Sequence, residues 1–201
     1  MAYSNFTLDT ARAAFHLEEI DAPGIFADID SVEPSAHLTT ALERKVALAF
    51  AIGTEKAKSE MIIAEVLVEL REHFDRRISL FSGVEFNVER DSDLTGVCDF
   101  VVSLSSIQFS LEAPVIILVE AKRDNLTEGL GQCVAEMVAA QRFNAEKGND
   151  IPRVYGAITS GRDWLFLKLE EQCLHIDMNA YPITQCDKVL GILASMVAQN
   201  A

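Results

Sequence analysis

The sequence has few basic residues for its length, and this scarcity narrows the classes of partner. Its 201 residues include 17 Lys and Arg against 31 Asp and Glu, a formal net charge of −14. Basic residues never occur in runs longer than two, as in Arg76-Arg77 and Lys122-Arg123. Affinity for nucleic acid comes largely from neutralising phosphates, so the composition disfavours a monomer that scans DNA freely. A local positive groove remains compatible with it.

Long apolar runs, paired cysteines and common catalytic motifs are also missing. No apolar run approaches the roughly 18 residues of a membrane helix, and the N-terminus lacks the layout of a secretion signal. We therefore expect a cytoplasmic protein outside the membrane. The four cysteines contain no CxxC pair, which predicts reduced, buried thiols rather than disulfides or a zinc site. P-loop, GxGxxG, HExxH and GxSxG motifs are absent, and the four histidines are isolated.

The hydrophobic periodicity predicts one α/β domain. We expect a helical extension over residues 1–53, a core over residues 54–170, and a C-terminal strand and helix over residues 171–201. The expected helices cover residues 9–18, 37–52, 54–73, 126–147 and 186–199. The expected strands cover residues 78–81, 84–89, 97–104, 115–122, 153–159, 164–169 and 173–176. The order predicts a mainly antiparallel sheet over residues 84–122, with the helix at 126–147 packed across it.

Charged residues interrupt two apolar strands of this core. The run at 115–119 ends in Glu120-Ala121-Lys122, and Asp99 stands inside the run at 97–102. If the two strands pair as an antiparallel hairpin, Asp99 lies opposite residue 119 or 120, about 4.5–5.5 Å away between Cβ atoms. Two carboxylates at that distance repel unless a cation lies between them. Hard oxygen ligands suit Mg²⁺ or Mn²⁺.

Asp99 followed by Glu120-Ala121-Lys122 resembles the PD-(D/E)XK motif of the restriction-endonuclease-like nucleases. The order of elements over residues 54–170 is similar to the common core of that superfamily, and the chain looks most like a bacterial branch of it. Cys98 stands where the motif has proline. The resemblance implies a metal-dependent phosphodiesterase, a hydrolase that cleaves nucleic acid. Asp99, Glu120 and the Ala121 carbonyl would hold the metal, and Lys122 would orient water or stabilise the transition state.

Two further residues match the resemblance. Glu60 lies in the apolar stripe of the helix at 54–73, where the family places an acid that holds a metal-bound water or a second metal. Gln132 shares a helical stripe with small residues and would position a substrate strand or the lysine.

Each of these residues also has a structural alternative. Glu120 and Lys122 could form an ion pair at the sheet end, and Asp99 could accept backbone hydrogen bonds. Glu60 could cap a neighbouring helix, and Gln132 could be an ordinary polar residue of a helix. The aromatic pair Trp164 and Phe166 fits a hairpin core better than a base-stacking platform.

Two other functions therefore stay open at this point. The chain could be a non-enzymatic interaction or regulatory module that retains the nuclease fold, which the acidic charge favours. It could also be a nuclease whose DNA contacts come from a protein partner or from a homodimer. The sequence alone gives neither the substrate nor the oligomeric state.

Overall fold

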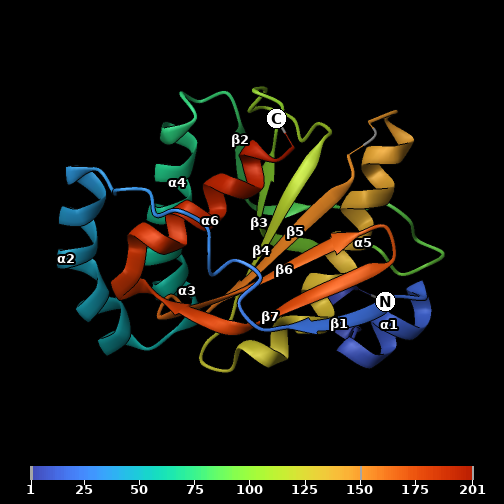
Figure 1. Ribbon diagram of the computed structural model, residues 1–201, viewed down its shortest axis with the longest axis horizontal. Helices are drawn as coiled ribbons and strands as arrows, with labels where there is room; N and C mark the ends of the chain where they lie inside the picture. The colour runs from blue at the N-terminus through green and yellow to red at the C-terminus, as the bar shows by residue number, and fades with distance from the viewer. Residues whose placement is uncertain (1, 150, 201) are drawn as a thin grey trace.

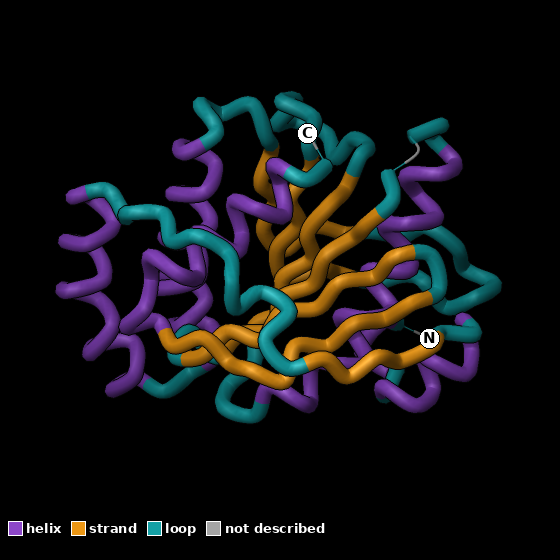
Figure 2. Tube along the Cα trace, in the orientation of Figure 1, coloured by secondary structure: helices purple, strands orange, loops and turns teal. Residues whose placement is uncertain are grey.

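The protein is built as a mixed sheet between two helical layers (Figures 1 and 2). The computed structural model describes residues 2–149 and 151–200. The sheet has seven strands in the order β1-β7-β6-β5-β4-β3-β2. Their bounds are β1 Glu18–Ala22, β2 Ser79–Glu85, β3 Val97–Ser103, β4 Val115–Ala121, β5 Arg153–Thr159, β6 Asp163–Glu170 and β7 Cys173–Pro182. This confirms the α/β class.

The strand directions divide the sheet into two antiparallel halves that meet at a parallel pair. Strands β2, β3 and β4 are antiparallel neighbours, as are β5, β6 and β7. Strand β4 runs parallel to β5, and β1 runs parallel to β7. Every residue of β4 is buried, which explains its continuous apolar run, because a central strand is covered on both faces.

The helices cover the two faces of the sheet (Figure 1). One core joins α2, α4 and α6 to side chains such as Ile117 and Val119, and the other joins α1 and α5 to Leu118. The helices are η1 Tyr3–Asn5, α1 Leu8–Phe15, α2 Ala36–Ile52, α3 Glu55–Lys58, the π-helical turn η2 Ser59–Ile63, α4 Ala64–His73, η3 Leu126–Gly129, α5 Leu130–Glu146, η4 Ile183–Gln185 and α6 Cys186–Ala198. The expected packing of α5 across the sheet is confirmed.

The predicted helix boundaries hold where capping residues mark them. Gly53 ends α2 in the left-handed region with a φ of 72°. The Thr54 hydroxyl accepts a hydrogen bond from Ala57 N at 3.1 Å and starts α3. Inside the predicted helix at 54–73, however, the π-helical turn Ser59–Ile63 separates α3 from α4. A π turn adds a residue to the helical repeat and shifts the buried stripe by one position.

The strand predictions needed three corrections. The segments at 78–81 and 84–89 are one strand, β2, which continues through Gly83 at a φ of 60°. Strand β1 falls where a loop was expected, because Ile20 is the one β-branched residue among Glu-Glu-Ile-Asp-Ala. Strand β7 extends to Pro182, beyond the predicted end at residue 176.

Other expectations from composition agree with the described residues. The four cysteines are free, and three of them are buried. Trp164 and Phe166 are fully buried, so they belong to the core rather than to a stacking surface. No helix within residues 2–149 and 151–200 is long and apolar enough to span a membrane.

Candidate active site

Strands β3 and β4 bring the two predicted acids together. Phe100 pairs with Val119, and extending this antiparallel register by one residue places Asp99 opposite Glu120. Asp99 Oδ2 accepts a hydrogen bond from Ala121 N at 2.8 Å. This bond fixes the Asp99 carboxylate beside the end of β4 and leaves its second oxygen for another partner.

Glu120 is completely buried beneath the helical layer that contains α5. Burial raises the pKa of Glu120 from 4.5 to about 7, and the nearby Asp99 carboxylate adds to the rise. Lys122 opposes the shift, since its Nζ lies 3.1 Å from Glu120 Oε2. Near neutral pH, Glu120 is therefore poised between its protonated and ionised forms, and a bound cation would favour the ionised one.

Lys122 is held by two acceptors. Its Nζ donates to Glu120 Oε2 and, at 3.2 Å, to Gln132 Oε1. Burial lowers the pKa of Lys122, but the Glu120, Asp99 and Glu55 carboxylates together outweigh this effect and raise the pKa above its ordinary value. Lys122 thus stays an ammonium ion, which can stabilise negative charge but cannot act as a base. With two of its three N–H bonds used, the third can reach a substrate.

Neighbouring elements leave little space around the Lys122 stem. A Cβ on Gly129 would lie 3.0 Å from Lys122 Cε and 2.8 Å from Ile158 Cγ2, so only glycine fits there without a shift. A second lysine, Lys58, is buried and donates to the Arg123 carbonyl and to Asp124 Oδ1. Lys58 therefore fastens the segment after Lys122 to α3. The sequence-based predictions did not include Lys58.

A third acid, Glu136, completes the cluster from α5. Gln132 Nε2 donates to Glu136 Oε1 at 3.1 Å, and Glu136 is fully buried. Burial, followed by the Glu120 charge, raises the pKa of Glu136 well above 4.5. The sequence-based predictions missed this residue too. The sequence does indicate that Glu136 is buried, because Glu136 is the only charged residue in the run 133–140. It also lies four residues after Gln132, on the same helical face.

Glu120 and Glu136 lie side by side in this cluster. Each carboxyl group lies within hydrogen-bonding reach of the other. Glu120 Oε1 and Glu136 Oε2 are buried and meet no donor in the described part of the chain other than the neighbouring carboxyl group, so they can pair only by sharing a proton. A buried unsatisfied polar group costs about 1–3 kcal/mol. The fold accepts this cost at the end of β4, and a proton or a cation between the carboxyl groups would remove it.

The donor set at this point fits a hard divalent cation. Mg²⁺ keeps several waters and is held by one or two carboxylates, which Asp99 and Glu120 supply. The Ala121 carbonyl directly follows Glu120 in the chain. Within residues 2–149 and 151–200, no group of three His, Cys, Asp or Glu side chains is arranged to enclose a metal.

The expected place of Glu60 in the apolar stripe is wrong. Its side chain is 58% exposed and pairs with Lys56 at 2.6 Å. The π-helical turn is the cause, because it rotates Glu60 out of the apolar stripe while Ile62 and Ile63 lie in the core. In the described part of the chain, Glu60 pairs with Lys56, whereas Lys122 pairs with Glu120.

Comparisons with known proteins leave this cluster as the main indication of function. The sequence matches no protein-family model. It has no significant match among curated proteins. Inferences about activity must therefore come from the geometry of the cluster itself.

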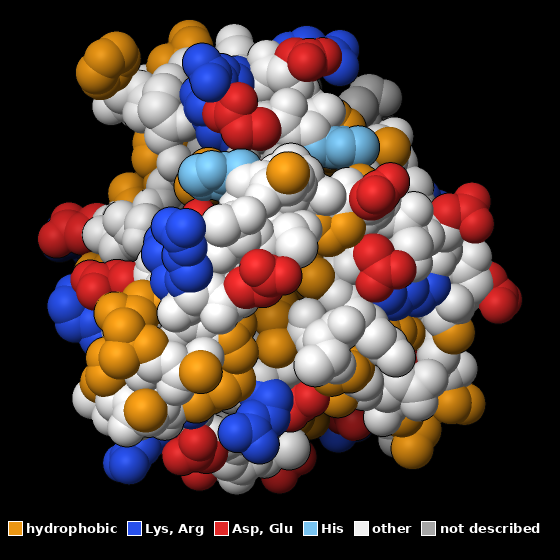
Figure 3. Space-filling view, turned by 90° about the vertical axis from the view of Figure 1, so that its left-hand side faces the viewer, with side chains coloured by type: hydrophobic (Ala, Val, Ile, Leu, Met, Phe, Trp, Pro, Cys, Tyr) orange, Lys and Arg blue, Asp and Glu red, His pale blue; other side chains and the backbone are white. Residues whose placement is uncertain are grey.

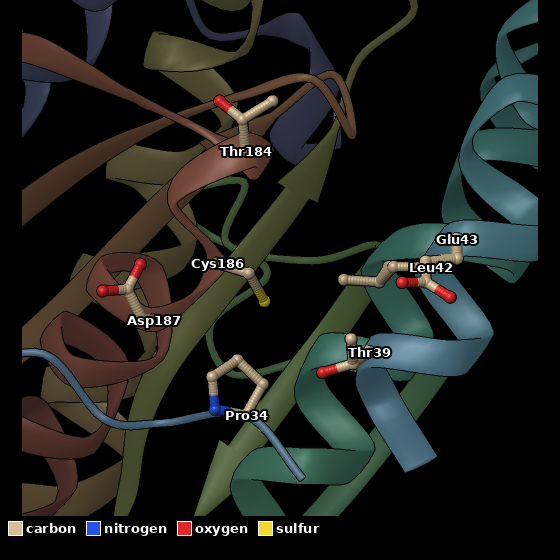
Figure 4. Close-up of a pocket in the computed structure, with 7 residues that line it drawn as sticks. All are labelled: Pro34, Thr39, Leu42, Glu43, Thr184, Cys186 and Asp187. Atoms are coloured by element: carbon tan, nitrogen blue, oxygen red, sulfur yellow. The ribbon is translucent and has the colours of Figure 1, made fainter. Parts of the chain in front are cut away.

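A separate cavity of about 300 Å³ lies between α2 and α6. Figure 4 shows that the Cys186 thiol points into the space between Pro34 and Leu42. Burial raises the pKa of Cys186 to about 12, so the thiol is not activated as a nucleophile. None of the residues that line this cavity belongs to the acidic cluster.

Proposed function

We propose that the chain is a metal-dependent phosphodiesterase that hydrolyses nucleic acid, with a restriction-endonuclease-like core of the PD-(D/E)XK type. The observation that carries the proposal is the position of Lys122 Nζ, 3.1 Å from the buried Glu120 carboxylate, beside Asp99 on the adjacent strand. Two carboxylates and an ammonium ion at the end of neighbouring strands form the arrangement that the D…ExK resemblance implies.

In this proposal, Asp99 and Glu120 hold Mg²⁺ or Mn²⁺, and the Ala121 carbonyl is a further ligand. Such an ion lowers the pKa of a water and neutralises charge on the phosphate. The backbone N–H of Ala121 keeps the Asp99 carboxylate in place. Burial of Glu120 excludes bulk water from one side of the site and strengthens its electrostatic interactions.

Lys122 acts on the phosphate as a fixed positive charge. Its ammonium ion is preorganised by Glu120 and Gln132, so little reorganisation is needed as negative charge develops. One N–H remains for a non-bridging phosphate oxygen or for the attacking water. Gln132 acts in this scheme by positioning the lysine.

The acidic charge favours a second candidate, a module of the same fold that acts only with a partner. On the face drawn in Figure 3, which bears α2, acidic and basic side chains are interspersed and form no continuous basic field. A protein partner or a second copy of the chain would then supply the phosphate contacts. Binding of nucleic acid by the isolated chain should be weak and should decrease steeply with salt.

The test of activity compares wild type with Lys122→Ala. Supercoiled, linear and single-stranded DNA, and RNA, are incubated with Mg²⁺ or Mn²⁺ at low salt. Removal of a preorganised charge from the transition state should lower the rate of cleavage by about 10²-fold or more and leave the fold intact. The matched control is Lys168→Ala, since Lys168 pairs with Glu170 at 3.3 Å on β6, away from the cluster. Equal cleavage by wild type and Lys122→Ala would remove the assignment of Lys122.

Metal binding is tested by thermal melts with and without Mn²⁺. Binding to the folded state alone stabilises it by about 2.7 kcal/mol at one hundred times the dissociation constant. We expect the melting temperature to rise in wild type but not in Glu120→Gln, which loses a charged ligand. A rise of equal size in both proteins would show that the ion binds elsewhere. Metal binding without cleavage of any substrate would favour the partner-dependent module.

A further inference from the structure

The orientation of the Gln132 side chain is fixed by chemistry at both of its ends. Lys122 Nζ can only donate, so it must face the amide oxygen, Oε1. The amide nitrogen, Nε2, then faces away from Lys122 and needs an acceptor, which Glu136 Oε1 provides at 3.1 Å. A glutamine without such an acceptor could turn over and present its N–H groups to the ammonium ion, and the two sets of donors would repel.

Glu136 is well placed to hold this orientation. It lies one helical turn after Gln132 on α5, so the two side chains share a face. Glu136 is fully buried, and bulk water therefore cannot replace it as the acceptor. The close approach of Gly129 to the Lys122 stem confines the lysine from another side.

We propose that Glu136 is a positioning residue that fixes the Gln132 amide by a hydrogen bond and so holds the Lys122 ammonium ion in one place. The chain of contacts runs from Glu136 Oε1 to Gln132 Nε2, and from Gln132 Oε1 to Lys122 Nζ. Its consequence for turnover rests on the proposed function, but its effect on Lys122 does not. Glu136 touches no substrate in this scheme and acts only through Gln132.

The test compares two substitutions at Glu136. Glu136→Gln keeps an amide oxygen that can accept from Gln132 Nε2, whereas Glu136→Met has similar volume and no such acceptor. The first readout is the NMR signal of the Lys122 side-chain N–H protons, which exchange slowly with water only while acceptors hold them. We expect Glu136→Gln to keep the signal, and Glu136→Met to broaden it.

The second readout is the kinetics of cleavage. Loss of an outer partner of a catalytic group typically costs 10–100-fold, so we expect kcat to fall by about tenfold or more in Glu136→Met with KM unchanged. Glu136→Gln should restore most of kcat. Because Glu136 acts through Gln132, the double variant Gln132→Leu/Glu136→Met should be no slower than Gln132→Leu alone.

Controls separate positioning from a general effect on folding. Gln141→Met, also on α5, removes a hydrogen bond to the Glu171 carbonyl and should leave the Lys122 signal unchanged. If Glu136→Met does not fold, Glu136→Asp tests the same loss, because the shorter acid withdraws from Gln132. An unchanged Lys122 signal in the variant that lacks the acceptor, or equal losses in Glu136→Gln and Glu136→Met, would overturn the proposal. A wild type that cleaves no substrate would contradict the proposed function, while the NMR readout would still decide the role of Glu136.

Discussion

Two regions of the molecule contain fully buried carboxyl groups. The hydrogen-bond partners of these groups differ between the two regions. On β7, Asp177 accepts four hydrogen bonds, from Gly24 N, Phe26 N, Asn179 N and the Tyr181 hydroxyl. At the end of β4, the buried Glu120 and Glu136 each retain an oxygen without a partner among the described residues. Asp177 is satisfied by donors of the protein, whereas Glu120 and Glu136 need a shared proton or a cation between them.

The difference separates a structural acid from a functional one. Asp177 ties the loop around residues 24–26 to β7, and every donor it meets belongs to that connection. Buried polar groups in proteins are almost always satisfied, so the exceptions need an explanation. Two adjacent buried acids that must share a proton or a cation, beside a lysine, are typical of a functional site. Burial alone therefore does not identify the site, whereas incomplete hydrogen bonding does.

The largest expected effect on stability comes from Asp177→Ala. This variant leaves four donors without their acceptor, and unsatisfied buried groups cost about 1–3 kcal/mol each before relaxation. We expect the free energy of unfolding to fall by about 3–5 kcal/mol, measured by urea denaturation at pH 7. Asp177→Asn, which keeps one acceptor oxygen, should lose less.

The comparison requires that this loss be purely structural. Folded Asp177→Ala should bind Mn²⁺ and cleave substrate like wild type. If Asp177→Ala instead lost metal binding while it remained folded, the distinction between the two buried acids would fail.

A smaller effect should appear in the pH dependence of stability. The pKa of Glu120 is raised to about 7 in the folded protein, against 4.5 as its ordinary value. Between these pH values the unfolded chain has lost a proton that the folded chain retains, so stability falls as the pH rises. The contribution of this carboxyl is present below pH 4.5 and is lost as the pH passes through about 7.

Urea denaturation at pH 4.5 and pH 8, applied to wild type and to Glu120→Gln, measures the contribution of the Glu120 carboxyl to the pH dependence of stability. Because Glu120→Gln does not titrate, the difference in stability between the two proteins should change by on the order of 2 kcal/mol over this range, in favour of the variant at high pH. A difference that is constant with pH would show that Glu120 is satisfied like Asp177. Mn²⁺ should reduce the change, since a cation stabilises the ionised form.

The part of this arrangement that follows from strand alternation was predictable from the sequence. An apolar run that ends in Glu120-Ala121-Lys122 predicts a buried strand with both charges on one face, and the register to Asp99 follows from the hairpin. Gln132 was found from its place on the helix that follows. Its contact with Lys122 is a three-dimensional fact that spacing indicates only loosely.

The errors come from local geometry that composition does not encode. The π-helical turn at Ser59–Ile63 contains no glycine or proline that would mark a break in the helix. The regular 3.6-residue period therefore placed Glu60 on the wrong face. Glu136 was overlooked because an acid in an amphipathic helix is usually solvated, and its burial depends on the path of α5 over β4 and β5. Lys58 was missed for the same reason, since its partners lie 65 and 66 residues away in sequence.

The smallest effect on stability and activity is expected for substitution of Glu60. This substitution tests whether Glu60 belongs to the site. An exposed pair between positions i and i+4 of a helix contributes about 0.2–0.5 kcal/mol, and the order of Lys56 before Glu60 is the less favourable one. Glu60→Ala should therefore change the free energy of unfolding by less than about 0.5 kcal/mol. Cleavage and Mn²⁺ binding should match wild type, because the carboxylate faces Lys56 instead of the acidic cluster. Glu65→Ala is a suitable comparison, since Glu65 is only 19% exposed and pairs with Lys45 between α4 and α2. A marked loss of Mn²⁺ affinity in Glu60→Ala, with no such loss in Glu65→Ala, would extend the site across the π-helical turn and return Glu60 to the metal.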